Sequence, residues 1–248
     1  MTLGRAILLI VAAVLGGTLN AVAGGGSFVT LPALLYAGVP PVMANATTAV
    51  ALWPGSLSSA IAYRRDIHTP AAPLALLVAT SIVGGLAGAF LLVRTSDTSF
   101  MRLLPWLMLL AAITFSFGDR VIRRQPDPAR HTVSPVGIAL QLAIAIYGGY
   151  FGGGMGIMML ATMTLAGMTD IHEMNGVKAM LGVSINGVAF ATFVAHGIVA
   201  WPPAAIMIAG AIVGGYGGAA VARQLDRRLV RLLVAALAWL MTVYFFVR

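Results

Sequence analysis

The feature that constrains this chain most is a succession of apolar segments separated by short polar loops. Hydrophobic residues make up 60% of its 248 residues and charged residues only 9%, whereas about a quarter of a soluble domain is charged. A surface this apolar would aggregate in water, but about 20 apolar helical residues cross a bilayer core. The sequence therefore predicts an all-α polytopic membrane protein, with segments at 3–23, 27–38, 42–63, 71–93, 100–122, 134–151, 155–168, 173–196, 202–222 and 228–247.

The positive charge indicates a membrane topology rather than a nucleic-acid partner. The formal net charge is +8, and most of the arginines lie in short loops, as the positive-inside rule and contact with anionic lipids require. We therefore expect the lipid bilayer as a partner and no nucleic acid. The chain has no cysteine, which excludes thiol catalysis and cysteine-ligated metals. We expect no cofactor and no metal, and we leave a homodimer open.

The chain contains one pattern twice, which predicts two homologous halves. A glycine triplet at 24–26 precedes the short segment 27–38, and a second triplet at 152–154 precedes the short segment 155–168. Residues 84–89 also match residues 214–219 at an offset of 130. We therefore expect a first membrane repeat at 1–122, a linker at 123–133 and a second membrane repeat at 134–248. Residues 3–23 resemble a signal peptide, but the second triplet is approached in the same way, so we interpret 3–23 as a retained helix.

The two short segments decide the predicted topology. As helices they would be about 18–21 Å long at 1.5 Å per residue, and unwound backbone cannot face lipid. They are broken or re-entrant, which gives 8–10 membrane segments. If all ten segments cross, ten arginines fall on one side and four on the other; with re-entrant segments the charges divide almost evenly. The positive-inside rule favours the first arrangement, which predicts inverted repeats with both termini outside the cytoplasm.

A polar stripe follows one face of two predicted helices. At 100° per residue, Asn175, Lys178 and Asn186 share a face of the segment 173–196, and Asn45 and Thr48 share the equivalent face of 42–63. Such a stripe faces the bundle interior, where it either binds a ligand or forms interhelical hydrogen bonds. The lysine is a costly intramembrane cation, which either holds an anion, reaches the interface, or pairs with a nearby glutamate.

The glycine triplets indicate an anion site. Helix N-termini carry a partial positive charge and free N–H groups, and helices broken near the midplane recur in transporters. The other interpretation is that the triplets mark tight turns. The acidic residues lie near segment ends or in loops, which favours an anionic substrate over a cation. The predicted substrate-binding residues are Gly24, Gly25, Gly26, Ser27, Asn45, Thr48, Gly152, Gly153, Gly154, Met155, Asn175, Lys178 and Asn186.

An enzymatic interpretation has little support. An intramembrane protease would use Ser27 as nucleophile and His196 as base, but Phe28 follows the serine where a second glycine would be needed. The second copy has Met155 in place of the serine, and a triad needs a third group to orient its base. We therefore predict that the protein is not an enzyme.

The motifs resemble those of the sulfite exporter TauE/SafE family of bacterial permeases. They are Gly-Gly-Gly-Ser-Phe-x-Thr-Leu-Pro-x-Leu, then Ala-Asn-Ala-Thr, then Gly-Gly-Gly-Met-Gly, and the resemblance covers nearly the whole chain. It implies a secondary transporter of small, often sulfur-containing or organic anions, such as sulfite or organosulfonates, in the prokaryotic inner membrane. An anion channel with the same donors is the alternative, and it would not saturate. The family motifs fall on Gly24, Gly25, Gly26, Ser27, Pro32, Asn45, Thr48, Gly152, Gly153, Gly154, Gly156, Asn175 and Lys178.

Overall fold

The computed structural model describes residues 2–122, 134–222 and 227–247, so the linker predicted at 123–133 lies outside the described residues. Across these ranges the regular structure is helical throughout, which confirms the all-α prediction. The helices are α1 (Leu3–Ala23), α2 (Ser27–Tyr36), α3 (Pro41–Tyr63), the 3-10 turn η1 (Arg64–Asp66), α4 (Ala71–Val93), α5 (Asp97–Ile122), α6 (Pro135–Tyr150), α7 (Met155–Leu165), α8 (Ile171–Ala195), α9 (Trp201–Ala222) and α10 (Arg227–Val247).

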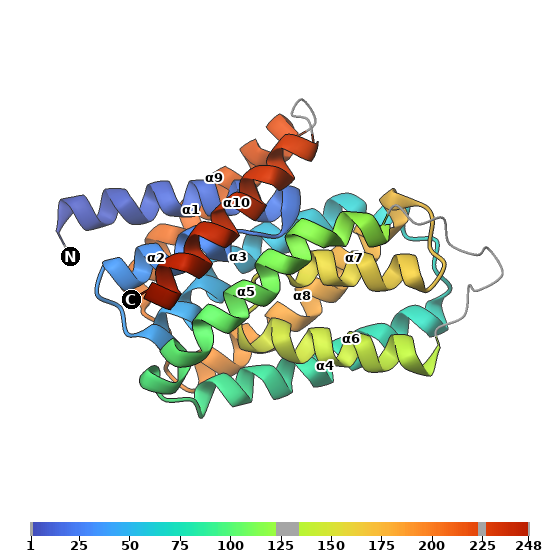
Figure 1. Cartoon of the computed structure of the whole chain (residues 1–248), viewed down its shortest axis with the longest axis horizontal. Helices are drawn as coiled ribbons and strands as arrows, with labels where there is room; N and C mark the ends of the chain where they lie inside the picture. Colours follow the sequence, from blue (N-terminus) through green and yellow to red (C-terminus); the bar gives the residue numbers. More distant parts are fainter. Residues whose placement is uncertain (1, 123–133, 223–226, 248) are drawn as a thin grey trace.

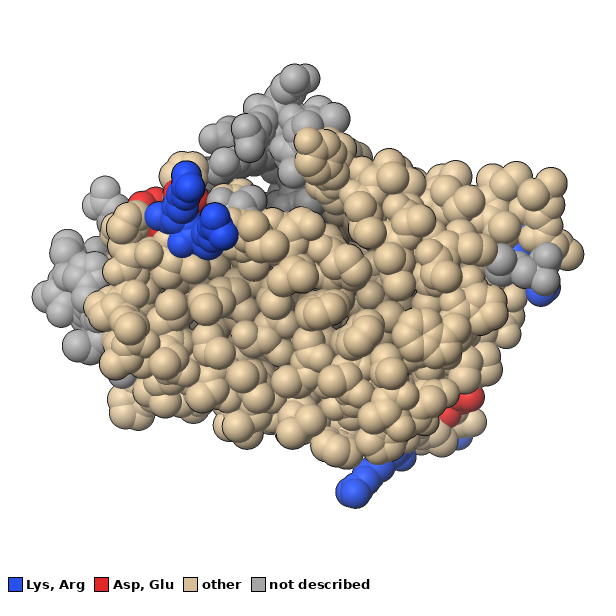
Figure 2. Space-filling view, turned by 180° about the vertical axis from the view of Figure 1, so that it is seen from behind, with Lys and Arg blue, Asp and Glu red and all other residues tan. Residues whose placement is uncertain are grey.

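Several helices are suited to a bilayer. Within the described ranges, four are long and apolar enough to cross it, and they lie in α1, α4, α5 and α8. The helix α6 has 16 residues and is shorter than the segment predicted at 134–151. Figure 2 shows that the Lys, Arg, Asp and Glu visible on that face lie near its margins, whereas its middle is uncharged. A broad uncharged surface between charged ends is the arrangement of a multi-pass membrane protein.

The glycine triplets break the helices as predicted. Gly24 ends α1 with a φ of 77°, and its N–H donates to Leu19 O and Asn20 O. Gly152 and Gly154 both have a φ of 83°. Glycine adopts this left-handed conformation at little cost, so each triplet turns the chain sharply. The helices that follow, α2 and α7, have only 10 and 11 residues.

Helices from the two halves of the chain pack in matching pairs (Figure 1). The first helix of each half packs along the fourth helix of the other, α1 with α9 and α6 with α4, and these two pairs form opposite edges of the molecule. The fifth helices, α5 and α10, pack against each other, as do the third helices, α3 and α8. The third helices therefore run through the centre, beside both chain breaks.

Small residues set the register of the edge pairs and correct the predicted alignment. A Cβ on Gly84 would lie 2.6 Å from Ala145 Cβ, and a Cβ on Gly210 would lie 2.9 Å from Ala13 Cβ. The two alanines are 132 residues apart, like the Gly16-Gly17 and Gly148-Gly149 pairs. Gly84 therefore corresponds to Gly210, at an offset of 126 and not 130. The error is one helical turn, because small residues recur at every fourth position on both helices.

The central helices α3 and α8 run antiparallel. Near the start of α3, Thr47 Oγ1 accepts from Ala200 N, beyond the end of α8, at 3.0 Å. Beyond the end of α3, Thr69 Oγ1 donates to Glu173 Oε1, near the start of α8, at 2.6 Å. Between these contacts, Trp53 Nε1 donates to Val183 O at 3.3 Å. The last two residues are 130 apart, so equivalent positions of the two helices meet at their crossing.

Candidate functional site

The two chain breaks meet in the interior. A methyl group added to Gly24 would approach within 3.9 Å of Gly156 Cα, and one added to Gly156 would lie 3.5 Å from Lys178 Cδ. Gly24 ends α1, Gly156 opens α7, and Lys178 lies in the second turn of α8. We call these three residues the glycine junction. The sequence predicted both the triplets and the lysine, and the fold brings them together.

The side chain of Lys178 is held in place by its own helix. Its Nζ donates to Asn175 Oδ1 at 2.8 Å, and Asn175 Nδ2 donates to Ile171 O at 2.8 Å. Glu173, in the first turn of the same helix, accepts a hydrogen bond from Thr69. Lys178 is also the only lysine in the sequence. Because Asn175 fixes the ammonium group, the junction has an oriented positive charge.

Both short helices begin without a side-chain cap. The N-cap of α2 is Gly26 and that of α7 is Gly154, and neither end has a side-chain cap hydrogen bond. The first N–H groups of a helix have no intrahelical acceptor, and they carry a partial positive charge. Gly25, Gly26, Gly153 and Gly154 are all buried. The two helix starts therefore present backbone donors inside the protein.

The predicted residues Ser27 and Met155 occupy different surroundings. Ser27 is half-buried at the first position of α2. The side chain of Met155 packs between α6 and α8, since a Cβ on Gly148 would lie 2.6 Å from its sulfur and one on Gly182 would lie 3.8 Å from its Cε. Its backbone N–H reaches Gly152 O at 3.5 Å, a long contact. Met155 thus contributes packing, whereas Ser27 begins the helix that follows the first triplet.

The polar stripe of α3 connects the two breaks. Asn45 Nδ2 donates to Tyr150 O, at the end of α6, at 2.8 Å. Two turns later, Leu52 Cδ1 lies 2.9 Å from the position of a Cβ on Gly26, at the first break. Thr48 lies between these two contacts on the same face. Asn45 Oδ1 and Thr48 Oγ1 are buried and have no hydrogen-bond partner among the described residues.

The rest of the predicted stripe lies further from the junction. Asn186 is half-buried in α8, two turns beyond Lys178, and its described surroundings do not link it to the triplets. Its counterpart in α3, Ser56, accepts from Asn20 Nδ2 at 3.3 Å. That bond joins α1 to α3, as expected for an interhelical contact.

Tyr147 is a site residue that sequence reasoning missed. Its hydroxyl donates to Gly153 O at 2.6 Å and lies 3.3 Å from Leu107 O. It thereby ties the second triplet to α5. The signal in the sequence is a pair of tyrosines, Tyr147 and Tyr150, on either side of two glycines just before the triplet.

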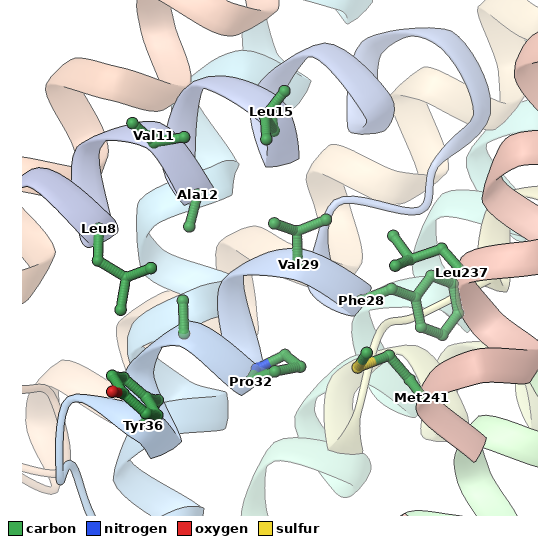
Figure 3. A pocket seen from close by; sticks show the side chains of 11 residues that line it. Leu8, Val11, Ala12, Leu15, Phe28, Val29, Pro32, Tyr36, Leu237 and Met241 are labelled. Carbon is green, nitrogen blue, oxygen red and sulfur yellow. The ribbon is translucent and has the colours of Figure 1, made fainter. Parts of the chain in front are cut away.

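One apolar groove opens between α1, α2 and α10 (Figure 3). Its volume is about 410 Å³, and its lining includes Leu8, Val29, Tyr36, Leu237 and Met241. The groove lies where α10 has few contacts with α2. The helices at the equivalent places in the repeated order, α5 and α7, pack closely on each other. An apolar lining gives an anion no compensation for its lost hydration, so the groove is not the anion site.

The residues suggested for a protease have other roles. His196 follows the end of α8, where its ring packs against Phe90 with centroids 5.5 Å apart and its Nδ1 lies 2.8 Å from Thr192 O. Ser27 lies at the start of α2, beside the first glycine triplet.

Apolar helices interrupted by two breaks are a recurring feature of membrane transporters. Comparison with known proteins agrees: residues 9–245 match the family model described as "Sulfite exporter TauE/SafE", and the chain belongs to this family. A probable membrane transporter protein of Haemophilus influenzae is 28% identical over 90% of this chain and 88% of its own length. A probable membrane transporter protein of Sinorhizobium is 30% identical, over 90% and 85%. The probable membrane transporter protein YfcA of Escherichia coli is 25% identical, over 93% and 85%. No solved structure matches the chain.

Proposed function

We propose that the protein is a secondary transporter that exports a small anion, a sulfur oxyanion such as sulfite or an organosulfonate, across the prokaryotic inner membrane. The observation that carries the proposal is the glycine junction, where Gly24, Gly156 and the Lys178 side chain converge. A half-buried cation beside backbone donors is suited to a group with several charged oxygens. The family description names sulfite export, which is consistent with this chemistry.

Each group at the junction has a role in the proposed site. The ammonium of Lys178 supplies a point charge, and Asn175 orients it. Backbone N–H groups of Gly25, Gly26 and Ser27 donate from the start of α2, and those of Gly153 and Gly154 donate from the start of α7. The absence of side chains on the glycines lets an oxyanion approach the backbone closely. No bond in the substrate is made or broken, so the protein acts as a carrier and not as an enzyme.

The proposed mechanism is alternating access between two inverted repeats. Three features support it: the repeated order of helices, the exchanged pairs α1–α9 and α4–α6, and the antiparallel central helices α3 and α8. Two halves in opposite orientations around one site can rock so that the site opens to each side in turn. Export of an anion out of an inside-negative cell is favoured by about 2.3 kcal/mol per charge per 100 mV. The family description and the names of the relatives favour a carrier over an anion channel.

The single lysine allows a direct test. The purified protein would be treated with an amine-reactive reagent in the presence of sulfite, sulfate, thiosulfate or a short alkylsulfonate, and the modification of Lys178 would be followed by peptide mass spectrometry. We expect one sulfur oxyanion to protect the lysine saturably. We also expect the same anion to bind Lys178→Met much more weakly. The control Arg102→Met, which removes an exposed positive charge elsewhere, should bind the anion like the parent. If no anion protects the lysine, or if Lys178→Met binds like the parent, the proposed site is wrong.

A further inference from the structure

The two central helices share an asparagine at equivalent positions but carry different residues one turn later. Asn45 corresponds to Asn175 at an offset of 130, and Thr48 corresponds to Lys178. In α8, the lysine ammonium donates to the amide oxygen of Asn175. In α3, a threonine stands in place of the lysine, so the amide oxygen of Asn45 lacks the cationic partner that its counterpart has.

The amide oxygen of Asn45 and the hydroxyl of Thr48 are buried without a partner. Asn45 is 3% exposed and Thr48 is 1% exposed, and neither Asn45 Oδ1 nor Thr48 Oγ1 has a hydrogen-bond partner in the part of the chain that the structure describes. The orientation of the amide is fixed, because its Nδ2 donates to Tyr150 O. The unpaired side-chain amide atom is therefore an acceptor. Buried polar groups are nearly always paired, so we expect a partner from outside the chain.

Other helical threonines in the described ranges show that the state of Thr48 is unusual. Thr114, Thr164, Thr192 and Thr242 each donate to the carbonyl four residues earlier, at 2.7–3.0 Å. This local bond is the common way for a threonine in an apolar helix to satisfy its hydroxyl. Thr48 does not form it, so both of its lone pairs remain available to a ligand.

The oxygens around this point suit a monovalent cation. Asn45 Oδ1 and Thr48 Oγ1 lie on one face of α3, and the carbonyl of Tyr150 lies at the C-terminus of α6, the negative end of its dipole. Half-helix C-termini and unwound carbonyls bind coupling cations in transporters, whereas divalent ions usually require carboxylates. We propose that Asn45, Thr48 and the C-terminus of α6 bind a monovalent cation, Na⁺, which takes the place that the Lys178 ammonium has in the other half.

The position of this cation site implies coupling to the anion. The α3 face that carries Thr48 runs from Tyr150, at the second break, to Gly26, at the first. A cation there lies beside the junction, and opposite charges in a low dielectric stabilise one another. Each ion should therefore raise the affinity for the other by the same factor. The coupling rests on the proposed anion transport, but cation binding by itself does not.

The test measures cation binding without the substrate anion. The melting temperature of the purified protein would be followed in NaCl, KCl and choline chloride at constant ionic strength. At about ten times its Kd, a cation that binds only the folded state should raise the melting temperature by about 3 °C. We expect this rise with Na⁺ and not with choline, and the same rise with K⁺ would support the site with lower size selectivity.

Variants connect the response to the proposed site. Thr48→Val, which removes only the hydroxyl, should raise the half-saturating Na⁺ concentration at least tenfold. Thr242→Val, at a buried threonine bonded within its own helix, should respond like the parent. If Thr48→Val does not fold, Asn45→Asp provides the second test, because the added carboxylate should lower the half-saturating Na⁺ concentration about tenfold. A parent protein that responds equally to all three salts would overturn the proposal, as would an unchanged response in Thr48→Val.

A further variant supplies the cation covalently. Thr48→Lys recreates the Asn–Lys pair of α8, and we expect it to bind the anion equally well with and without Na⁺. The protein could bind Na⁺ in a way that Thr48→Val abolishes and yet bind no anion from the panel. That result would support the cation site and reject the proposed function. Anion binding at the junction with no cation response would reject the cation site alone.

Discussion

Substitutions in the edge pairs test whether close glycine packing holds the two halves together. A Cβ on Gly84 of α4 would lie 2.6 Å from Ala145 Cβ and 2.9 Å from Leu142 O, both in α6. Because carbon atoms prefer about 3.5–4.0 Å, the helices must separate by roughly 1 Å to accept Gly84→Ala. Overpacking of this kind costs about 1–3 kcal/mol, against about 0.5–1 kcal/mol gained by removing a helical glycine. We expect a net loss of stability of about 1–2 kcal/mol.

Two further glycine substitutions, one a control in α9 and one at the equivalent position of the other edge pair, test the same prediction. Gly217→Ala in α9 meets nothing within 4 Å, so it should raise the melting temperature by about 1–4 °C through helix propensity alone. Gly84→Ala should lower it by about 2–8 °C. Gly210→Ala, whose nearest contact is 2.9 Å, should fall between the two. Melting would be followed by fluorescence-detected size exclusion in one detergent, and equal melting temperatures for Gly84→Ala and Gly217→Ala would refute the packing account.

Three further predictions concern the site. Lys178→Met removes a charged hydrogen-bond donor worth about 1.5–3 kcal/mol, so calorimetry should show anion binding weakened about 10- to 150-fold, and an unchanged Kd would remove the lysine from the site. Tyr147→Phe leaves Gly153 O without its 2.6 Å bond and should cost about 1–3 kcal/mol; a melting temperature equal to that of the parent would show that the bond is unimportant. Gly154→Ala imposes a φ of 83° on a residue with a Cβ, at about 1–2 kcal/mol, and should reduce transport in vesicles.

The helices, the chain breaks and the polar face of α3 could be predicted, because each depends on a local pattern in the sequence. Apolar length located the helices, and the glycine triplets located both breaks, because a left-handed φ at Gly24 and Gly154 needs glycine. Periodicity correctly placed Asn45 and Thr48 on one face of α3. The family resemblance was also confirmed, since its motifs are local too.

Long-range contacts could not be predicted from that pattern. The predicted site already combined the two glycine triplets, but the contacts by which Gly24 approaches Gly156 depend on how the halves dock. The predicted sequence alignment of α4 with α9 was wrong by one helical turn, because small residues recur at every fourth position of both helices. The bond from Asn45 to Tyr150 O could not be predicted, because a backbone carbonyl at the end of a helix carries no residue-type signal.

Counterflow of labelled sulfite in proteoliposomes that contain the parent protein or Lys178→Met, in the presence of Na⁺, would test the proposed transport directly. A carrier whose site opens to one side at a time exchanges internal unlabelled anion for external label. We expect transient accumulation of label that saturates with sulfite concentration in the parent and is strongly reduced in the variant. Uptake that rises linearly without accumulation would indicate a channel, and equal counterflow in the two proteins would contradict the assignment of the site to the glycine junction.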